Sequence, residues 1–99
     1  MIEYDGLQVG VMEAQLLIRG AQSLKEKRRV LRSLKDHVKN KFNVSVAEVG
    51  AQDRWQRAIL GFSAIANEKH FLEKELSTVT SFLRMFPGVE LLETNLEYY

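Results

Sequence analysis

Residues 12–35, MEAQLLIRGAQSLKEKRRVLRSLK, decide the fold because they pass from a strand pattern to a helix pattern within a few positions. Apolar and polar side chains alternate over residues 8–19, as in a strand with one buried face. Gly20 ends the alternation. Ser23 then stands three residues before Glu26, the spacing at which a hydroxyl and a carboxylate cap the first free N–H groups of a helix. The sequence therefore predicts a strand followed by a helix that begins after Ser23.

The predicted helix is amphipathic. At about 100° per residue, its apolar side chains fall in one arc, which contains Leu24, Leu31, Leu34, Val38 and Phe42. A second arc, interrupted only by Asp36, contains the basic side chains Lys25, Arg28, Arg29, Arg32, Lys35 and Lys39. Lys27 falls inside the apolar arc, where a charge is rare. Either its stem packs and its amine reaches water, or it pairs with a carboxylate such as Glu48.

Four further segments complete the order of elements. Residues 42–50 and 57–66 are rich in β-branched and apolar side chains, and their six-residue connection predicts a hairpin. Asn67 is predicted to cap a second helix, which the Pro-Gly pair at 87–88 ends. A last strand is predicted over residues 89–97.

The predicted order is β-α-β-β-α-β. With right-handed crossovers, this order gives a ferredoxin-like α+β sandwich, in which a four-stranded antiparallel sheet carries both helices on one face. The length fits a single domain over residues 1–99. The other face of the sheet stays open, and alternation assigns to it Glu13, Gln15, Leu17, Ile59, Gly61, Ser63 and Ile65. Because this face is too apolar to stay in water, we expect a ligand or, more simply, a second copy of the chain to cover it.

The composition, with 45% hydrophobic and 27% charged residues, is typical of a soluble globular protein. The chain has no cysteine, which excludes disulfides, thiolate catalysis and cysteine-based zinc sites and fits a reducing compartment. The opening MIEYDGLQVG lacks the basic and apolar regions of a secretory signal, and no stretch is apolar enough to span a bilayer. We therefore expect a cytoplasmic protein without a membrane segment.

Charge is distributed unevenly along the chain. Residues 19–41 hold nine Lys or Arg and two acids, whereas the rest holds five Lys or Arg and eleven acids, so the formal net charge is only +1. Such asymmetry favours a polyanionic partner or a self-complementary surface. The six cations of the predicted helix span about 20 Å at 1.5 Å per residue, enough to follow several phosphates of a nucleic acid. The alternative is a solvated helix surface that only aids solubility.

The hairpin connection is a second candidate for RNA contact, because Trp55 stands there among Arg54, Gln56 and Arg57. An exposed indole beside guanidinium groups suits stacking on a base. The alternative is a packed anchor at a sheet edge or a dimer interface. Residues 57–66 lack the paired aromatic side chains of an RNA-recognition motif, which disfavours that particular mode of stacking.

Three segments together resemble the YlxP-like family of small bacterial proteins: SLKEKR at 23–28, FNVSVAEVG at 42–50 and DRWQRAILGF at 53–62. The resemblance implies a ferredoxin-like fold. Genes of this family often stand among those for translation initiation and ribosome maturation, so it also implies an association with RNA or the ribosome, but no particular reaction. The side chains to which it points are Ser23, Leu24, Lys25, Lys27, Arg28, Phe42, Asn43, Ser45, Ala47, Glu48, Asp53, Trp55 and Gln56.

Candidate catalytic residues are few. His37 and His70 lie in different predicted helices without acids at metal-ligand spacing, so we predict no metal or cofactor site. Acylphosphatases share this fold and length, but the loop after Arg19 has one glycine, and residues 57–66 contain no asparagine to orient a water. We therefore expect a non-enzymatic RNA-associated protein. The alternatives are a homodimeric interaction module and an acylphosphatase-like hydrolase.

Overall fold

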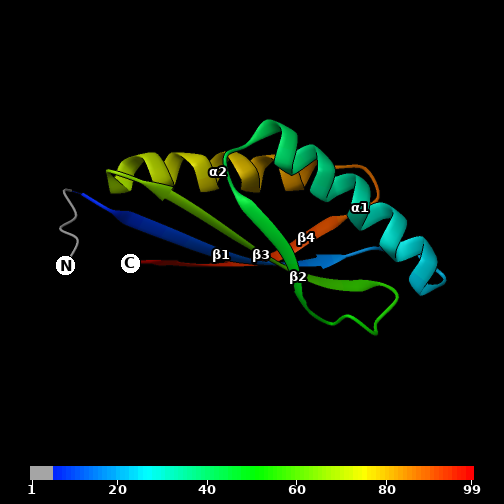
Figure 1. The fold of residues 1–99 in the computed structure, drawn as a ribbon. Coiled ribbons are helices and arrows are strands. Elements are labelled where there is room, and N and C mark those ends of the chain that lie inside the picture. The colour runs from blue at the N-terminus through cyan, green and yellow to red at the C-terminus, as the bar shows by residue number, and fades with distance from the viewer. Residues whose placement is uncertain (1–5) are drawn as a thin grey trace.

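The computed structural model describes residues 6–99, which form six elements in the predicted order: β1 (Gln8–Leu17), α1 (Leu24–Lys41), β2 (Ser45–Gly50), β3 (Arg57–Ala66), α2 (Lys69–Met85) and β4 (Glu90–Tyr98). The four strands form one antiparallel sheet in the order β2-β3-β1-β4. Both helices lie on the same side of this sheet, which leaves its other side open (Figure 1). The ferredoxin-like α+β fold is therefore confirmed. We call the connection between β2 and β3, residues 51–56, the hairpin loop.

The core lies between the helices and the sheet. Helix α1 packs over β2, and α2 packs over the other three strands. The buried cluster consists of Met12, Ala14, Leu16, Ile18, Ala21, Leu31, Leu34, Val38, Ala58, Leu60, Phe62, Leu76, Val79 and Leu83. Because each helix contributes positions three or four residues apart, one side of each helix is buried and the other faces solvent. Within residues 6–99, neither helix is apolar over a length that could cross a membrane.

The start of α1 is fixed by the predicted capping residues. Ser23 is the N-cap, and its Oγ accepts a hydrogen bond of 3.1 Å from the backbone N–H of Glu26. The Glu26 carboxylate accepts a hydrogen bond of 2.5 Å from the backbone N–H of Gln22, one residue before the N–H that a capping box usually satisfies. These two bonds anchor the basic helix just after the end of β1.

The start of α2 differs from the prediction. Its N-cap is Glu68, and no side-chain hydrogen bond caps this helix. Glu68 has extended backbone angles, φ −141° and ψ 143°, so the first helical residue is Lys69 and Asn67 lies one residue too early to cap it. The prediction of an Asn67 cap is therefore wrong. β3 ends at Ala66 as predicted, but the chain is still extended at Glu68, so α2 begins one residue too late for Asn67 to cap it.

Candidate nucleic-acid interface

The outer side of α1 carries the six predicted cations, which we call the basic patch: Lys25, Arg28, Arg29, Arg32, Lys35 and Lys39. All are exposed except Lys35, which is half-buried. Between residues 6 and 99, no carboxylate comes within ion-pair distance of any of them; the pairs that do form are Arg19–Glu90, Lys27–Glu48 and His70–Glu68. The positive charge of the patch is therefore not neutralised by the described part of the chain.

Four of these cations enclose a hollow on the helix surface. Lys25, Arg28, Arg29 and Arg32 line a cavity of about 320 Å³. They stand at positions i, i+3, i+4 and i+7, so their side chains rise from the same side of the helix. Guanidinium groups offer planar sets of N–H donors that match phosphate oxygens, and a lysine adds a compact charge. The hollow therefore has the chemistry of a phosphate site.

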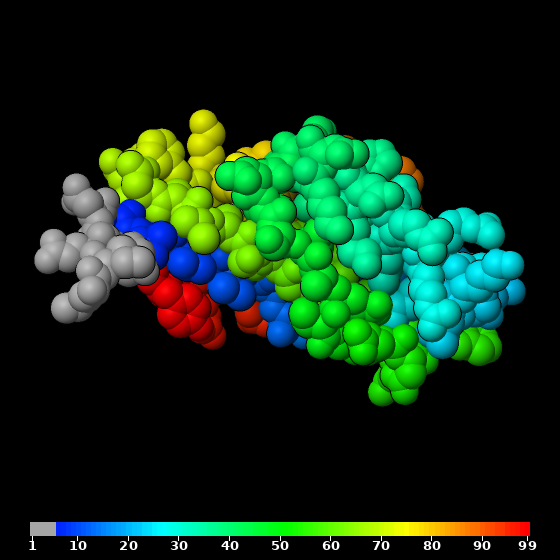
Figure 2. Space-filling view, viewed as in Figure 1, coloured from blue at the N-terminus to red at the C-terminus, as the bar shows by residue number. Residues whose placement is uncertain are grey.

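Hydrogen bonds hold the hairpin loop against the first turn of α1 and the segment just before it. Lys27 Nζ donates a hydrogen bond of 2.7 Å to the carbonyl of Ala51, at the start of the loop. Gln56, at its other end, donates from Nε2 to the carbonyls of Arg19 and Ala21, at 3.1 and 3.0 Å. Figure 2 shows the first turns of α1, in cyan, at one end of the molecule beside the green hairpin. The loop and the first residues of the basic patch therefore lie at the same end.

Among residues 6–99, Lys27 is the only charged side chain that is fully buried, with 1% of its surface exposed. Its Nζ lies 2.9 Å from Oε2 of Glu48, whose side chain is 19% exposed. That oxygen has no donor aligned well enough for a hydrogen bond, so the contact is a charge pair. Of the two alternatives for Lys27, the pair with Glu48 is confirmed, and an amine that reaches water is wrong because the side chain is fully buried. The pair explains how a charge is accommodated in the apolar arc of α1, because Glu48 and the Ala51 carbonyl both face the amine.

The candidate residues of the hairpin separate into two groups. Arg54 and Trp55 are exposed, and Trp55 keeps 54% of its surface in contact with solvent. Arg57 is paired with Leu17 in the sheet and donates a hydrogen bond of 3.3 Å to Oε1 of Gln15, on the open face. The structure therefore places Arg54 and Trp55 in the loop fastened to α1, whereas the Arg57 guanidinium is engaged on the open face of the sheet.

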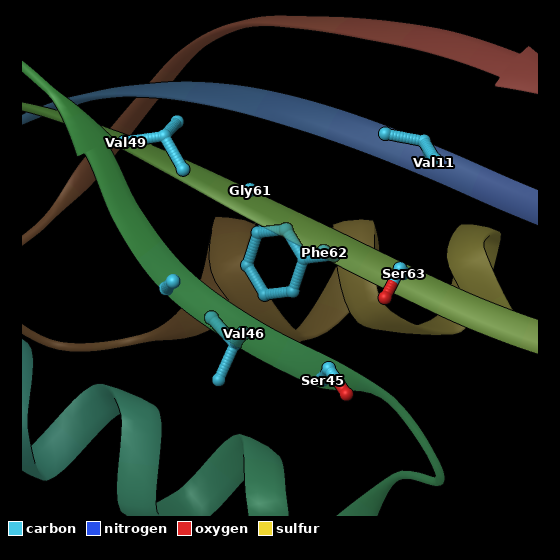
Figure 3. Close-up of a pocket in the computed structure, with 8 residues that line it drawn as sticks. Val11, Ser45, Val46, Val49, Gly61, Phe62 and Ser63 are labelled. Carbon is cyan, nitrogen blue, oxygen red and sulfur yellow. The ribbon is translucent and has the colours of Figure 1, made fainter.

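The open face has the residues that alternation predicts, and it adds an apolar groove that the prediction missed. Val11, Val49, Gly61 and Ser63 are among the residues that line a cavity of about 240 Å³ (Figure 3). Gly61 keeps the groove open, because a Cβ there would lie 3.1 Å from Cγ1 of Val49. The missed signal is the alternation of β2, which places Val49 on the same face.

The candidate catalytic and metal-binding residues make contacts that do not bring them together. Arg19 Nη2 lies 3.2 Å from Oε1 of Glu90, in an exposed pair with the last strand. Nδ1 of His37 lies 2.7 Å from the Ser33 carbonyl, one turn earlier in α1. In the part of the chain that the structure describes, no three His, Asp or Glu side chains are grouped so as to hold a metal ion.

Comparison with known proteins gives a family and a fold. A family model described as "Protein of unknown function (DUF503)" matches residues 9–96. The chain is 43% identical over 91 residues to "Uncharacterized protein YlxP" of Bacillus subtilis (strain 168), which covers 92% of this chain and 99% of that protein. Among solved structures, it is similar to the de novo designed protein Foldit4, with a TM-score of 0.54, 13% identity, and coverage of 93% of this chain and 96% of that one. At that identity, the similarity to Foldit4 shows the fold alone.

Proposed function

The chain belongs to the family described as protein of unknown function DUF503 and is YlxP-like, and we propose that it is a non-enzymatic protein that binds the phosphate backbone of RNA through the basic patch of α1. The observation that carries this proposal is the hollow lined by Lys25, Arg28, Arg29 and Arg32. Like charges held this close repel one another, and a bound phosphate relieves the repulsion. Ribosomal RNA is the first candidate, since the YlxP-like family implies a place in ribosome maturation or translation.

Charge reversal tests this proposal. The variant Arg28→Glu/Arg29→Glu should lower the affinity for a labelled ribosomal RNA fragment at least tenfold, and acids in the first turns of a helix do not destabilise it. The matched control is Lys74→Glu/Arg84→Glu, which makes the same change in net charge at exposed positions of α2. If both variants lost affinity equally, the effect would be one of net charge in general, and the basic patch would be excluded as the binding site.

Salt dependence gives a second test of the same proposal. If the four cations of the hollow each replace one counterion on a single strand, the slope of log affinity against log salt is about −2.8. The affinity of the unmodified protein should then fall roughly 50-fold between about 50 and 200 mM salt. Binding that does not change over this range would contradict a phosphate-backbone contact.

The open face of the sheet supports a second candidate function, a homodimeric interaction module. Val49 and Ile65 are 56% and 65% exposed there, and none of the residues that line the groove beside Val49 is charged. The ten residues of β3, across three strand spacings, give roughly 500 Å² per copy, or about 1,000 Å² for two copies. That area reaches the lower limit for specific protein interfaces. The groove beside Val49 has no charged lining, so this part of the face opposes no like charges when it meets its own copy.

Sedimentation velocity tests the second candidate function, the homodimer. A dimer through the open face should persist at high salt, and the variant Val49→Glu/Ile65→Glu should convert it to a monomer. Met85→Glu, at an exposed position at the end of α2, is the control and should leave the dimer intact. If the unmodified protein is a monomer up to about 100 μM, the hypothesis of a homodimer is rejected.

A further inference from the structure

The hairpin loop presents an aromatic side chain in a fixed position. Trp55 lies next to Gln56, whose side chain holds the carbonyls before α1, and the backbone N–H of Arg54 donates a hydrogen bond of 3.0 Å to the carbonyl of Ala51. Lys27 binds that same carbonyl from inside α1. One end of the loop is therefore held by α1 and the other by the segment just before it, while the indole itself stays 54% exposed.

An indole held in this way is suited to stacking. Tryptophan is usually well buried, and a loop free to move could turn it toward the protein surface. Here hydrogen bonds hold the loop backbone on both sides of Trp55, so little backbone entropy is lost when a base stacks on the exposed ring. Every RNA base has a face that can stack on an aromatic ring, and stacking needs no particular base sequence.

We propose that Trp55 stacks on an unpaired base whose neighbouring phosphates lie in the basic patch, so that the ligand is single-stranded RNA. This inference rests on the proposed binding of RNA phosphates by α1 and names the class of RNA. Bases inside a duplex already stack on one another and offer no free face, so a duplex can engage only the cations. Lys27 is a positioning residue, because it fixes the loop relative to α1 without reaching the surface itself.

The fluorescence of Trp55 reports on this contact directly, since it is the only tryptophan in the chain. The full protein is titrated with three RNA probes of twelve nucleotides per strand: single-stranded oligouridine, the same strand with abasic residues in place of the bases, and a blunt duplex. The single strand should quench Trp55, whereas the abasic strand and the duplex should bind with little quenching. Equal quenching by the abasic strand would overturn the inference.

Substitution of Trp55 measures the contribution of the stack. Trp55→Ala should weaken binding of the single strand about tenfold, as expected for one base–aromatic stack, and Trp55→Phe should retain most of the affinity. Neither variant should change binding of the abasic strand, followed by the anisotropy of a 5′ fluorescein. An unchanged affinity of Trp55→Ala for the single strand refutes stacking and leaves the basic patch in place. Two other outcomes would refute the proposed RNA binding itself, and not only the stacking: that no probe binds, or that Arg28→Glu/Arg29→Glu leaves binding of the single strand unchanged.

The role of Lys27 is tested in a variant designed to stay folded, Lys27→Met/Glu48→Leu, which replaces the buried charge pair by apolar side chains. The readout is the ratio of affinities for the oligouridine and abasic strands, because a loosened loop weakens stacking but leaves the phosphate contacts. This ratio should fall several-fold toward one, with abasic binding unchanged. A ratio equal to that of the unmodified protein, or an equal loss for both strands, would show that Lys27 has no positioning role.

Discussion

The substitution Lys27→Met gives the sharpest test of the structure. Methionine keeps the unbranched stem of lysine. It removes the charge that lies 2.9 Å from Glu48 Oε2 and the hydrogen bond of 2.7 Å to the Ala51 carbonyl. Glu48 then stands on an edge strand without its partner, and the carbonyl loses its donor. Both groups face a position from which water is excluded, since Lys27 is 1% exposed.

The expected cost follows from these distances. Two unit charges 2.9 Å apart attract by about 6 kcal/mol at an effective dielectric constant of about 20, and desolvation offsets most of that attraction. Removal of one partner of a buried pair costs about 3–5 kcal/mol. Because the Glu48 side chain is 19% exposed and therefore less completely buried than Lys27, we expect the lower value, about 3 kcal/mol. In a chain of 99 residues, this lowers Tm by roughly 12–24 °C.

Urea denaturation followed by circular dichroism measures this free energy of unfolding. The control is Lys25→Met, the same substitution two residues earlier at an exposed position, which should change the stability by less than about 0.5 kcal/mol. The double variant Lys27→Met/Glu48→Leu should recover most of the loss, because a well-packed apolar pair can replace a buried ion pair. A loss below about 1 kcal/mol in Lys27→Met would refute the reasoning, as would a double variant less stable than the single one.

Three further predictions concern stability. Ser23→Ala should lower the free energy of unfolding by about 1 kcal/mol, since it removes the cap of α1, and urea denaturation will show whether it does. Asn67→Ala should change it by less than about 0.5 kcal/mol in the same assay, and a loss as large as that of Ser23→Ala would contradict the uncapped start of α2. Burial, with a smaller effect of the Glu73 charge, raises the pKa of Tyr98 above its ordinary value of 10.0, so the folded chain holds this proton more tightly than the unfolded chain does. The resulting stability is present below about pH 10 and is lost as the pH rises further, and a Tyr98→Phe variant denatured at several pH values should lack this loss.

The features that local spacing determines were predictable from the sequence. Ser23 and Glu26 are three residues apart, and this spacing alone identifies the start of α1. The period of the helix also separates the buried Leu31 and Leu34 from the exposed cations. Lys27 was recognisable because a charge inside an apolar arc needs either a partner or a route to water, although the sequence did not decide between the two. Glu48 was a reasonable partner because it is an acid in a β-branched strand, and the pair is confirmed.

The features that depend on contacts between distant segments were not predictable. The Asn67 prediction failed because the chain stays extended at Glu68, one residue past the favourable capping residue, before α2 begins. The hydrogen bond from Arg57 to Gln15 follows from the register of Arg57 opposite Leu17, which no local pattern reveals. The fastening of the hairpin loop depends on Gln56 reaching backbone carbonyls of another segment, and a lone glutamine gives no sequence signal for such a bond.

The position of β1 in the sheet constrains how the molecule can be made. This strand is synthesised before the others, yet it lies between β3 and β4 and forms pairs along both of its edges. Its first partner strand, β3, begins at Arg57, and its second, β4, begins at Glu90. During synthesis, β1 therefore stays unpaired until most of the chain has left the ribosome, although one of its faces is apolar. Strands that pair over such long sequence separations form slowly, and until then their unpaired edges are exposed and prone to aggregation. Any fragment that stops before Glu90 leaves one edge of β1 bare, and we expect it to aggregate rather than to survive as a smaller domain.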